Sequence, residues 1–104
     1  MTPLFIPLKT EYFEAFKAGT KTTECRVYGP RWNERTCAIG RPVVLSKGYG
    51  KAHRINGTVI GFWQSTAATF SEDWQACYGD RGNRVAAIIR IAVSISTTQP
   101  NGDR

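Results

Sequence analysis

Three charged residues in one short segment form the strongest candidate for a chemical site in this sequence. Lys21, Glu24 and Arg26 bring together an ammonium, a carboxylate and a guanidinium. An amine and a carboxylate in one cleft can share general acid–base catalysis, and a guanidinium binds a phosphate or carbonyl oxygen through parallel hydrogen bonds. Lys21 and Glu24 are therefore candidate catalytic residues, and Arg26 is a candidate RNA-binding residue. The alternative is a structural ion pair between Glu24 and Arg26.

The segment that carries these residues is predicted to start a strand. Helical apolar spacing ends before Gly19, which suits a left-handed helix C-cap. The following alternation, Thr20–Tyr28, is typical of a strand. On a regular strand Glu24 and Arg26 share one face, whereas Lys21 points to the other. Lys21 and Glu24 therefore reach one cleft only if the strand is bulged or twisted there.

A glycine-rich loop around Tyr49 is a second candidate site. Glycines let backbone amides approach a phosphate, lysines neutralise it, and a tyrosine offers a face for base stacking. His53 is the only histidine, and its basic neighbours favour a solvated or phosphate-facing role over catalysis. The candidate RNA-binding residues of this segment are Lys47, Tyr49, Lys51, His53 and Arg54.

A third candidate follows the predicted strand and begins after Pro30. Arg31 and Arg35 are candidate RNA-binding residues, and Trp32 could stack on a base. The alternative for Trp32 is packing in the hydrophobic core. Because proline suits the first position of a helix, the sequence predicts a short helix over Arg31–Cys37.

The net charge of +6 is concentrated in one part of the chain. Residues 15–55 carry nine basic and two acidic side chains, a balance of +7, whereas residues 1–14 have −1 and residues 56–104 have zero. A localised basic excess attracts polyanions and speeds their encounter. Solubilising charge alone would be spread more evenly, so the pattern favours a nucleic-acid partner. The segment is too rich in glycine and proline for a basic amphipathic helix on a membrane surface.

Composition indicates one folded domain. With 104 residues and 41% hydrophobic side chains, the chain is long enough for one core. Aromatic residues reach 12% and charged residues only 21%, which excludes a disordered chain. No apolar run approaches the ~20 residues of a membrane-spanning helix, and the N-terminus lacks a secretory pattern. We expect a cytoplasmic protein without a membrane partner, in an oligomeric state that the sequence leaves open.

The cysteines indicate neither disulfides nor a metal site. Cys25, Cys37 and Cys77 cannot all pair, and none has the spacing of a metal-binding knuckle. With a single histidine available as well, a zinc site is not expected. We therefore expect free thiols in a reducing compartment, and no metal or other cofactor.

Periodicity and turn residues predict an α+β fold, a small β-barrel with short flanking helices, over residues 1–96, followed by a flexible tail at 97–104. The last strand is apolar on both faces, which predicts a central strand in which Arg90 needs a partner or a route to solvent. The predicted elements are strands at Pro3–Leu8, Thr20–Tyr28, Pro42–Ser46, Arg54–Trp63 (broken by Gly57) and Arg84–Ile95, and helices at Glu11–Ala18 (with Thr10 as N-cap), Arg31–Cys37 and Ser71–Tyr78.

The pattern Gly19-x-Lys21-Thr22-x-Glu24-x-Arg26, after a strand at 4–8 and a short helix, resembles the ASCH family of the PUA-like superfamily. The segments Gly40–Ser46 and Gly57–Phe62 fit the family's pattern of a glycine entering a strand and a strand returning. The resemblance extends from residue 4 to about residue 93. It implies a PUA-like β-barrel, a cleft lined by the motif's lysine, glutamate and arginine, and RNA or modified nucleosides as ligands.

The resemblance leaves several functions open. Some ASCH proteins bind nucleic acid without chemistry. In an RNA-binding domain of this kind Lys21 and Arg26 would hold phosphate, Glu24 would read a base edge or act as a base, and Tyr49 would stack. This RNA-binding role is our leading expectation. Others are ribonucleases, whose motif lysine corresponds to Lys21. Others remove an acyl group from N4 of cytidine with that lysine and a threonine nucleophile, which this chain replaces by Glu24. An interaction module with an acidic protein partner is a further alternative.

Overall fold

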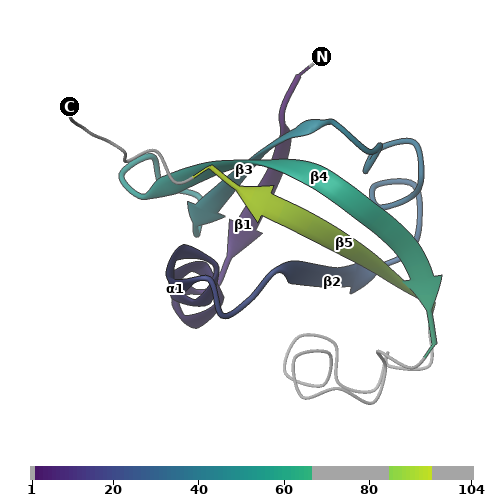
Figure 1. Cartoon of the computed structure of the whole chain (residues 1–104), viewed down its shortest axis with the longest axis horizontal. Helices are drawn as coiled ribbons and strands as arrows, with labels where there is room; N and C mark the ends of the chain where they lie inside the picture. The colour runs from purple at the N-terminus through teal and green to yellow at the C-terminus, as the bar shows by residue number, and fades with distance from the viewer. Residues whose placement is uncertain (1, 67–84, 95–104) are drawn as a thin grey trace.

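A curled mixed β-sheet organises the chain (Figure 1). A computed structural model describes residues 2–66 and 85–94. Within these residues the chain forms five strands and one helix, in the order β1 (Leu4–Leu8), α1 (Thr10–Ala18), β2 (Thr23–Val27), β3 (Pro42–Lys47), β4 (Arg54–Ser65) and β5 (Ala86–Val93). No helix in this part of the chain has the length and apolar character needed to cross a bilayer.

The strand order β1-β3-β4-β5-β2 makes β1 and β2 the two edges of the sheet. β1 pairs with β3 in parallel, and the other neighbours are antiparallel. The sheet curls into a half-barrel, so that the two edge strands approach each other (Figure 1). The Arg26 Nη2 group of β2 donates a 2.6 Å hydrogen bond to the Pro7 carbonyl of β1. One side chain therefore bridges the open side of the half-barrel.

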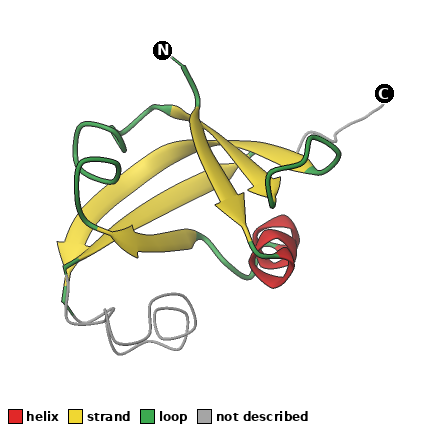
Figure 2. Cartoon of the chain, turned by 180° about the vertical axis from the view of Figure 1, so that it is seen from behind, coloured by secondary structure: helices red, strands yellow, loops and turns green. Residues whose placement is uncertain are grey.

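The hydrophobic core lies inside the curl. Helix α1 lies against β1 and β3 at one end of the sheet (Figure 2). Phe13 and Phe16, one helical turn apart, are its buried residues, as expected of an amphipathic helix. The strands contribute alternating apolar side chains from their inner face, namely Leu4, Ile6, Leu8, Val43, Leu45, Val59, Ala87, Ile89 and Ile91.

All five predicted strands and the first helix are confirmed, with shifts at their ends. Thr10 is the first helical residue, and Lys9 occupies the N-cap without a side-chain capping bond. Gly19 has φ 84°, so the predicted left-handed C-cap is confirmed. The strand predicted at Thr20–Tyr28 is β2, which begins only at Thr23.

The helix predicted over Arg31–Cys37 is wrong: this segment is a series of turns. The side chain of Asn33 explains the difference. Its Nδ2 donates to the Gly29 carbonyl at 2.8 Å, and its Oδ1 accepts from the backbone N–H groups of Arg35 and Thr36 at 2.9 and 3.1 Å. Such local side-chain bonds compete with the backbone pattern of a helix.

Strands β4 and β5 contain the irregular part of the sheet. The interruption lies between Val59 and Gly61, and the prediction that Gly57 breaks the strand is wrong. Gly57 instead lets strands β4 and β5 lie close together, because a Cβ at this position would lie only 2.8 Å from the Ala92 carbonyl oxygen. β5 is central, between β4 and β2, as predicted.

Arg90 of β5 reaches solvent, and its guanidinium lies 5.8 Å from the centroid of the Trp63 ring. The partner and the route to solvent that the sequence required are both found. The helix predicted at Ser71–Tyr78 and the tail at 97–104 lie outside the described residues.

Candidate functional site

The three charged residues of the sequence motif meet at the inner face of β2. Because β2 begins at Thr23, Lys21 precedes the regular strand. The alternation of side chains along the strand therefore does not direct Lys21 to the face opposite Glu24. Its Nζ lies 3.8 Å from Oε1 of Glu24, and Nε of Arg26 donates to Oε2 of Glu24 at 2.7 Å. The departure from a regular strand that the sequence required is present, and one carboxylate lies between two cations.

Glu24 is buried, with 7% of its surface exposed. A buried carboxylate is costly unless it is paired and hydrogen-bonded, and here both neighbouring cations supply that compensation. The register explains its position: Glu24 lies opposite Ile89 and Arg26 opposite Ala87, both on the core side of the sheet. The structural ion pair that the sequence offered as an alternative is therefore present in the geometry.

Arg26 is held from three sides. Besides its bonds to Glu24 and to the Pro7 carbonyl, its guanidinium lies 4.9 Å from the centroid of the Trp32 ring. A guanidinium stacks on an aromatic face and keeps its N–H groups in the ring plane for hydrogen bonds. Arg26 is thus fixed in direction before any ligand arrives.

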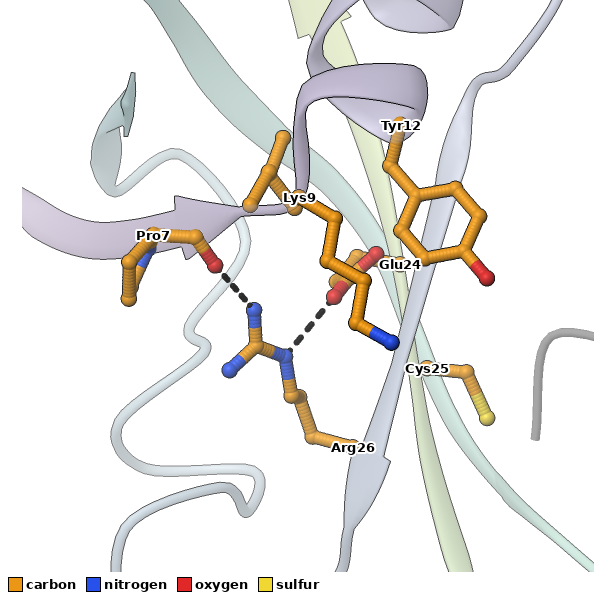
Figure 3. Close-up of a pocket in the computed structure, with 7 residues that line it drawn as sticks. Pro7, Lys9, Tyr12, Glu24, Cys25 and Arg26 are labelled. Carbon is orange, nitrogen blue, oxygen red and sulfur yellow. Dashed lines mark hydrogen bonds and ion pairs between the residues drawn. The ribbon is translucent and has the colours of Figure 1, made fainter. Parts of the chain in front are cut away.

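A pocket of about 270 Å³ opens beside this cluster (Figure 3). Lys9 and Tyr12, from the junction of β1 and α1, form the wall opposite β2. Neither was a candidate from the sequence, because neither belongs to a motif and only the curl of the sheet brings them near β2. The described residues that line the pocket are Pro7, Leu8, Lys9, Tyr12, Glu24, Cys25 and Arg26.

Lys21 is not among the described residues lining this pocket. Its ammonium lies 5.2 Å from the centroid of the Tyr12 ring and 5.7 Å from that of Phe16, so aromatic faces help to hold the charge. Chemically, the pocket combines a carboxylate acceptor, a fixed guanidinium and the amine of Lys9, and the amine of Lys21 lies beside the carboxylate. Such a set can bind an anion next to a group with N–H donors, or transfer a proton between Lys21 and Glu24.

A second, more open pocket of about 330 Å³ continues from the first. The two share Pro7, Leu8, Lys9 and Arg26, and the second adds Gly48 and Tyr49 from the predicted loop. Two of the three segments chosen from the sequence therefore meet at Arg26.

Tyr49 is 79% exposed, and its ring centroid lies 6.2 Å from that of Phe5 on β1. Phe5 also has the guanidinium of Arg54 at 5.2 Å from its ring centroid. Tyr49 and Arg54 thus form one cluster around Phe5.

The other basic residues of the loop do not line either pocket. Lys47 forms a 2.9 Å ion pair with Glu14 of α1 and lies 5.5 Å from the centroid of the Phe13 ring. The hydrogen bond from Lys47 holds the pKa of Glu14 below its ordinary value. Lys51 and His53 are exposed. The charge of Lys47 is thus paired with helix α1, whereas Lys51 and His53 face solvent.

The third predicted segment, residues 31–35, contacts Arg26 through the ring of Trp32. Trp32 is 8% exposed and belongs to the hydrophobic core, which is the alternative that the sequence left open. Arg31 is exposed, with its guanidinium 5.6 Å from the centroid of the Trp32 ring, and Arg35 is also exposed.

Glu34 ties this segment to the sheet. It accepts hydrogen bonds from the hydroxyl of Tyr28 and from Nε2 of Gln64. These bonds lower the pKa of Glu34, and the bond to Glu34 raises the pKa of Tyr28.

Residues 2–66 and 85–94 contain no group of three or more histidine, cysteine or acidic side chains placed to hold a metal ion. Cys37 is a free thiol that lies buried in the core. In comparisons with known proteins, no family model matches the chain, and no curated protein matches it.

Proposed function

We propose that this protein is an ASCH-type, PUA-like domain that binds single-stranded or modified RNA, or a nucleoside derived from it, in the cleft between β1 and β2. One observation carries the proposal: a pocket with a buried carboxylate between cations continues into an open pocket beside an exposed tyrosine. A carboxylate accepts hydrogen bonds from base N–H groups, a guanidinium binds phosphate, and an aromatic ring stacks on a base.

The surroundings of the cleft support a polyanionic ligand. Lys9 lies in the shared wall of both pockets, and Arg54 flanks the Phe5–Tyr49 pair at the open end. A narrow concave pocket with a buried acid suits a single planar group better than the flat face of an acidic protein. Nucleic acid is therefore the better supported partner class.

A ribonuclease is the second candidate, and the proximity of Lys21 and Glu24 favours it. Their 3.8 Å separation is beyond a direct hydrogen bond but is spanned by a small movement or one water. The acylcytidine amidohydrolase has less support. Glu24 replaces the family's threonine nucleophile, and no serine or threonine is among the described residues that line the pocket.

The test is a titration of labelled RNA and DNA oligomers by fluorescence anisotropy, with the products then separated on a gel. If the cleft binds without chemistry, Lys21→Ala weakens RNA binding by about 1–3 kcal/mol, as loss of a charge-assisted contact does. Glu24→Gln is then nearly neutral or strengthens binding, because the amide oxygen still accepts a hydrogen bond from a base and a negative charge near phosphate is removed. Product formation by the parent protein that both variants abolish would instead establish the ribonuclease.

Lys17→Ala is the matched control for Lys21→Ala. Lys17 is an exposed lysine in the last turn of α1 and lines neither pocket. Thermal unfolding followed by circular dichroism shows whether each variant keeps its fold. RNA binding that is unchanged by Lys21→Ala and Arg26→Lys in folded protein would contradict the proposed cleft.

A further inference from the structure

The geometry points to a site for two linked nucleotides rather than for one nucleoside. One base occupies the first pocket, beside Glu24, the next base stacks on Tyr49, and the phosphodiester between them lies on the shared wall at Lys9 and Arg26. This inference rests on the proposed function and specifies the ligand of the same cleft.

The sizes of the two pockets favour a ligand that places one small unit in each. Their volumes of about 270 and 330 Å³ lie at or below the lower end of the ~300–1,000 Å³ typical of drug-sized ligand sites. Each pocket alone has room for one ring-sized group. Because they share four lining residues, the two pockets adjoin, and one extended ligand can contact both.

The shared wall has the right chemistry for the link. Arg26 uses Nε for Glu24 and Nη2 for the Pro7 carbonyl, and its Nη1 donates to no residue within 2–66 or 85–94. Figure 3 shows the third nitrogen of the guanidinium pointing away from both partners. The exposed ammonium of Lys9 forms no ion pair with the described part of the chain. Lys9 and Arg26, which both line the two pockets, thus supply cationic donors at the shared wall.

Glu24 determines which part of the ligand enters the first pocket. A phosphate placed there would meet a buried carboxylate that already compensates Arg26 and Lys21. A base edge with N–H donors would meet an acceptor instead. The order base, phosphate, base therefore matches the order acid, cations, aromatic ring along the groove.

Tyr49 is prepared for stacking before the ligand binds. Its exposed ring is supported by Phe5, and the preceding Gly48 has φ 68°, a left-handed conformation that favours glycine and turns the loop toward β1. Base stacking on such a ring typically strengthens binding by about 5- to 100-fold.

The experiment measures the dissociation constants of nucleosides, mononucleotides and dinucleoside monophosphates at one salt concentration, by isothermal titration calorimetry. We expect the dinucleoside monophosphates to bind about tenfold or more tightly than the mononucleotides. Tyr49→Ala should lower the affinity for the dinucleoside monophosphates to about that for the mononucleotides, whereas Tyr49→Phe should retain the gain. Trp63→Ala is the matched control, since Trp63 is also an exposed aromatic residue and lines neither pocket.

The phosphate position is tested with a methylphosphonate link, which has no charge. This ligand should bind about tenfold more weakly than the phosphodiester, and Lys9→Ala should remove most of the difference. Lys9→Ala leaves helix α1 intact, because Lys9 makes no side-chain capping bond. Ribose and deoxyribose dinucleotides are compared as well. Equal affinities for the ribose and deoxyribose dinucleotides support the two-unit site, since the side chains of that site recognise bases and phosphate and not the sugar.

The outcomes separate this inference from the function on which it rests. Equal affinity for mononucleotides and dinucleotides, with no effect of Tyr49→Ala, overturns the two-unit site and leaves nucleotide binding in place. An equal loss for both ligands in Tyr49→Ala also overturns it, because Tyr49 would then contact the first unit. Absence of binding by every nucleotide overturns the proposed function itself.

Discussion

The cluster around Glu24 and the loop 47–54 contain the same kinds of charged residue but use them in opposite ways. In the cluster, Lys21 and Arg26 are largely buried and directed at one carboxylate. In the loop, Lys51 and Arg54 face solvent, where ion pairs contribute little and salt screens them. The difference lies in burial rather than residue type: buried charges determine geometry, whereas exposed charges attract a ligand.

Lys47 and Arg41 show that position in a basic segment does not establish a ligand-binding role. Lys47 is paired with Glu14, and Arg41 donates hydrogen bonds to the backbone carbonyls of Thr2 and Thr36 at 3.0 and 2.6 Å. Both hold the fold together. The balance of +7 in residues 15–55 therefore overstates the charge available to a ligand.

The largest effect is expected for Arg26→Met. This change removes the bridge between the edge strands and takes the 2.7 Å guanidinium partner away from the buried Glu24, so the free energy of unfolding should fall by about 3–5 kcal/mol. Urea denaturation followed by circular dichroism measures it. The double variant Arg26→Met/Glu24→Gln should recover part of the loss, because the buried charge is gone. Arg35→Met, at an exposed arginine, is the control.

If the free energy of unfolding falls by less than about 1 kcal/mol in Arg26→Met, the Arg26–Glu24 pair behaves like a surface ion pair. This result would contradict the contrast drawn between the buried cluster and the exposed loop. RNA binding should be lost in Arg26→Met even under conditions where the protein stays folded. Retention of binding would show that the cleft does not use this guanidinium.

Lys51→Ala and Lys47→Ala form a matched pair in the loop. The affinity of RNA should fall steeply as salt rises from about 0.05 to 0.2 M. Lys51→Ala should weaken binding for every sequence and reduce the slope of log affinity against log salt by up to about one. Lys47→Ala should have a smaller effect, since Glu14 already balances that charge. Equal effects would mean that the ion pair with α1 does not persist in the complex.

Cys37 is expected to make stability depend on alkaline pH. Burial raises the pKa of its thiol above the ordinary value of 9.0, so the unfolded state loses this proton first. The contribution to stability is complete below 9.0 and is lost as the pH rises through the higher, folded-state pKa. Urea denaturation at about pH 7 and about pH 10 should show a drop that is smaller in Cys37→Ala. An identical drop in the variant would assign it to other groups.

The smallest effect is expected for Glu14→Gln, which releases Lys47 from its ion pair. RNA affinity should rise slightly at low salt and be unchanged at high salt, as measured by anisotropy. The pKa of Glu14 is lowered by the hydrogen bond from Lys47, so the contribution of this pair to stability is present above the ordinary carboxyl pKa of 4.5. It is lost as the pH falls through the lowered pKa. A stability of Glu14→Gln equal to the parent's at neutral pH would show that the pair contributes nothing.

Local features of this protein could be predicted from the sequence because they depend on near neighbours. The apolar run that covers both faces is sufficient to locate β5, and the spacing of Phe13 and Phe16 locates α1. Gly19 ends that helix because a residue without Cβ adopts φ 84° at no cost. The helix predicted at 31–37 failed for an equally local reason, since the bonds of Asn33 compete with helical ones.

Only the tertiary structure decided where the charged residues act. Strand spacing predicts that Glu24 and Arg26 share a face, but the curl of the sheet brings Pro7, Lys9 and Tyr12 against them. The tertiary structure also gives two residues of one loop different surroundings: Lys47 pairs with Glu14, whereas Tyr49 lines the second pocket. These contacts join residues far apart in the chain. They depend on strand order and sheet curvature, which no short-range pattern of side chains encodes.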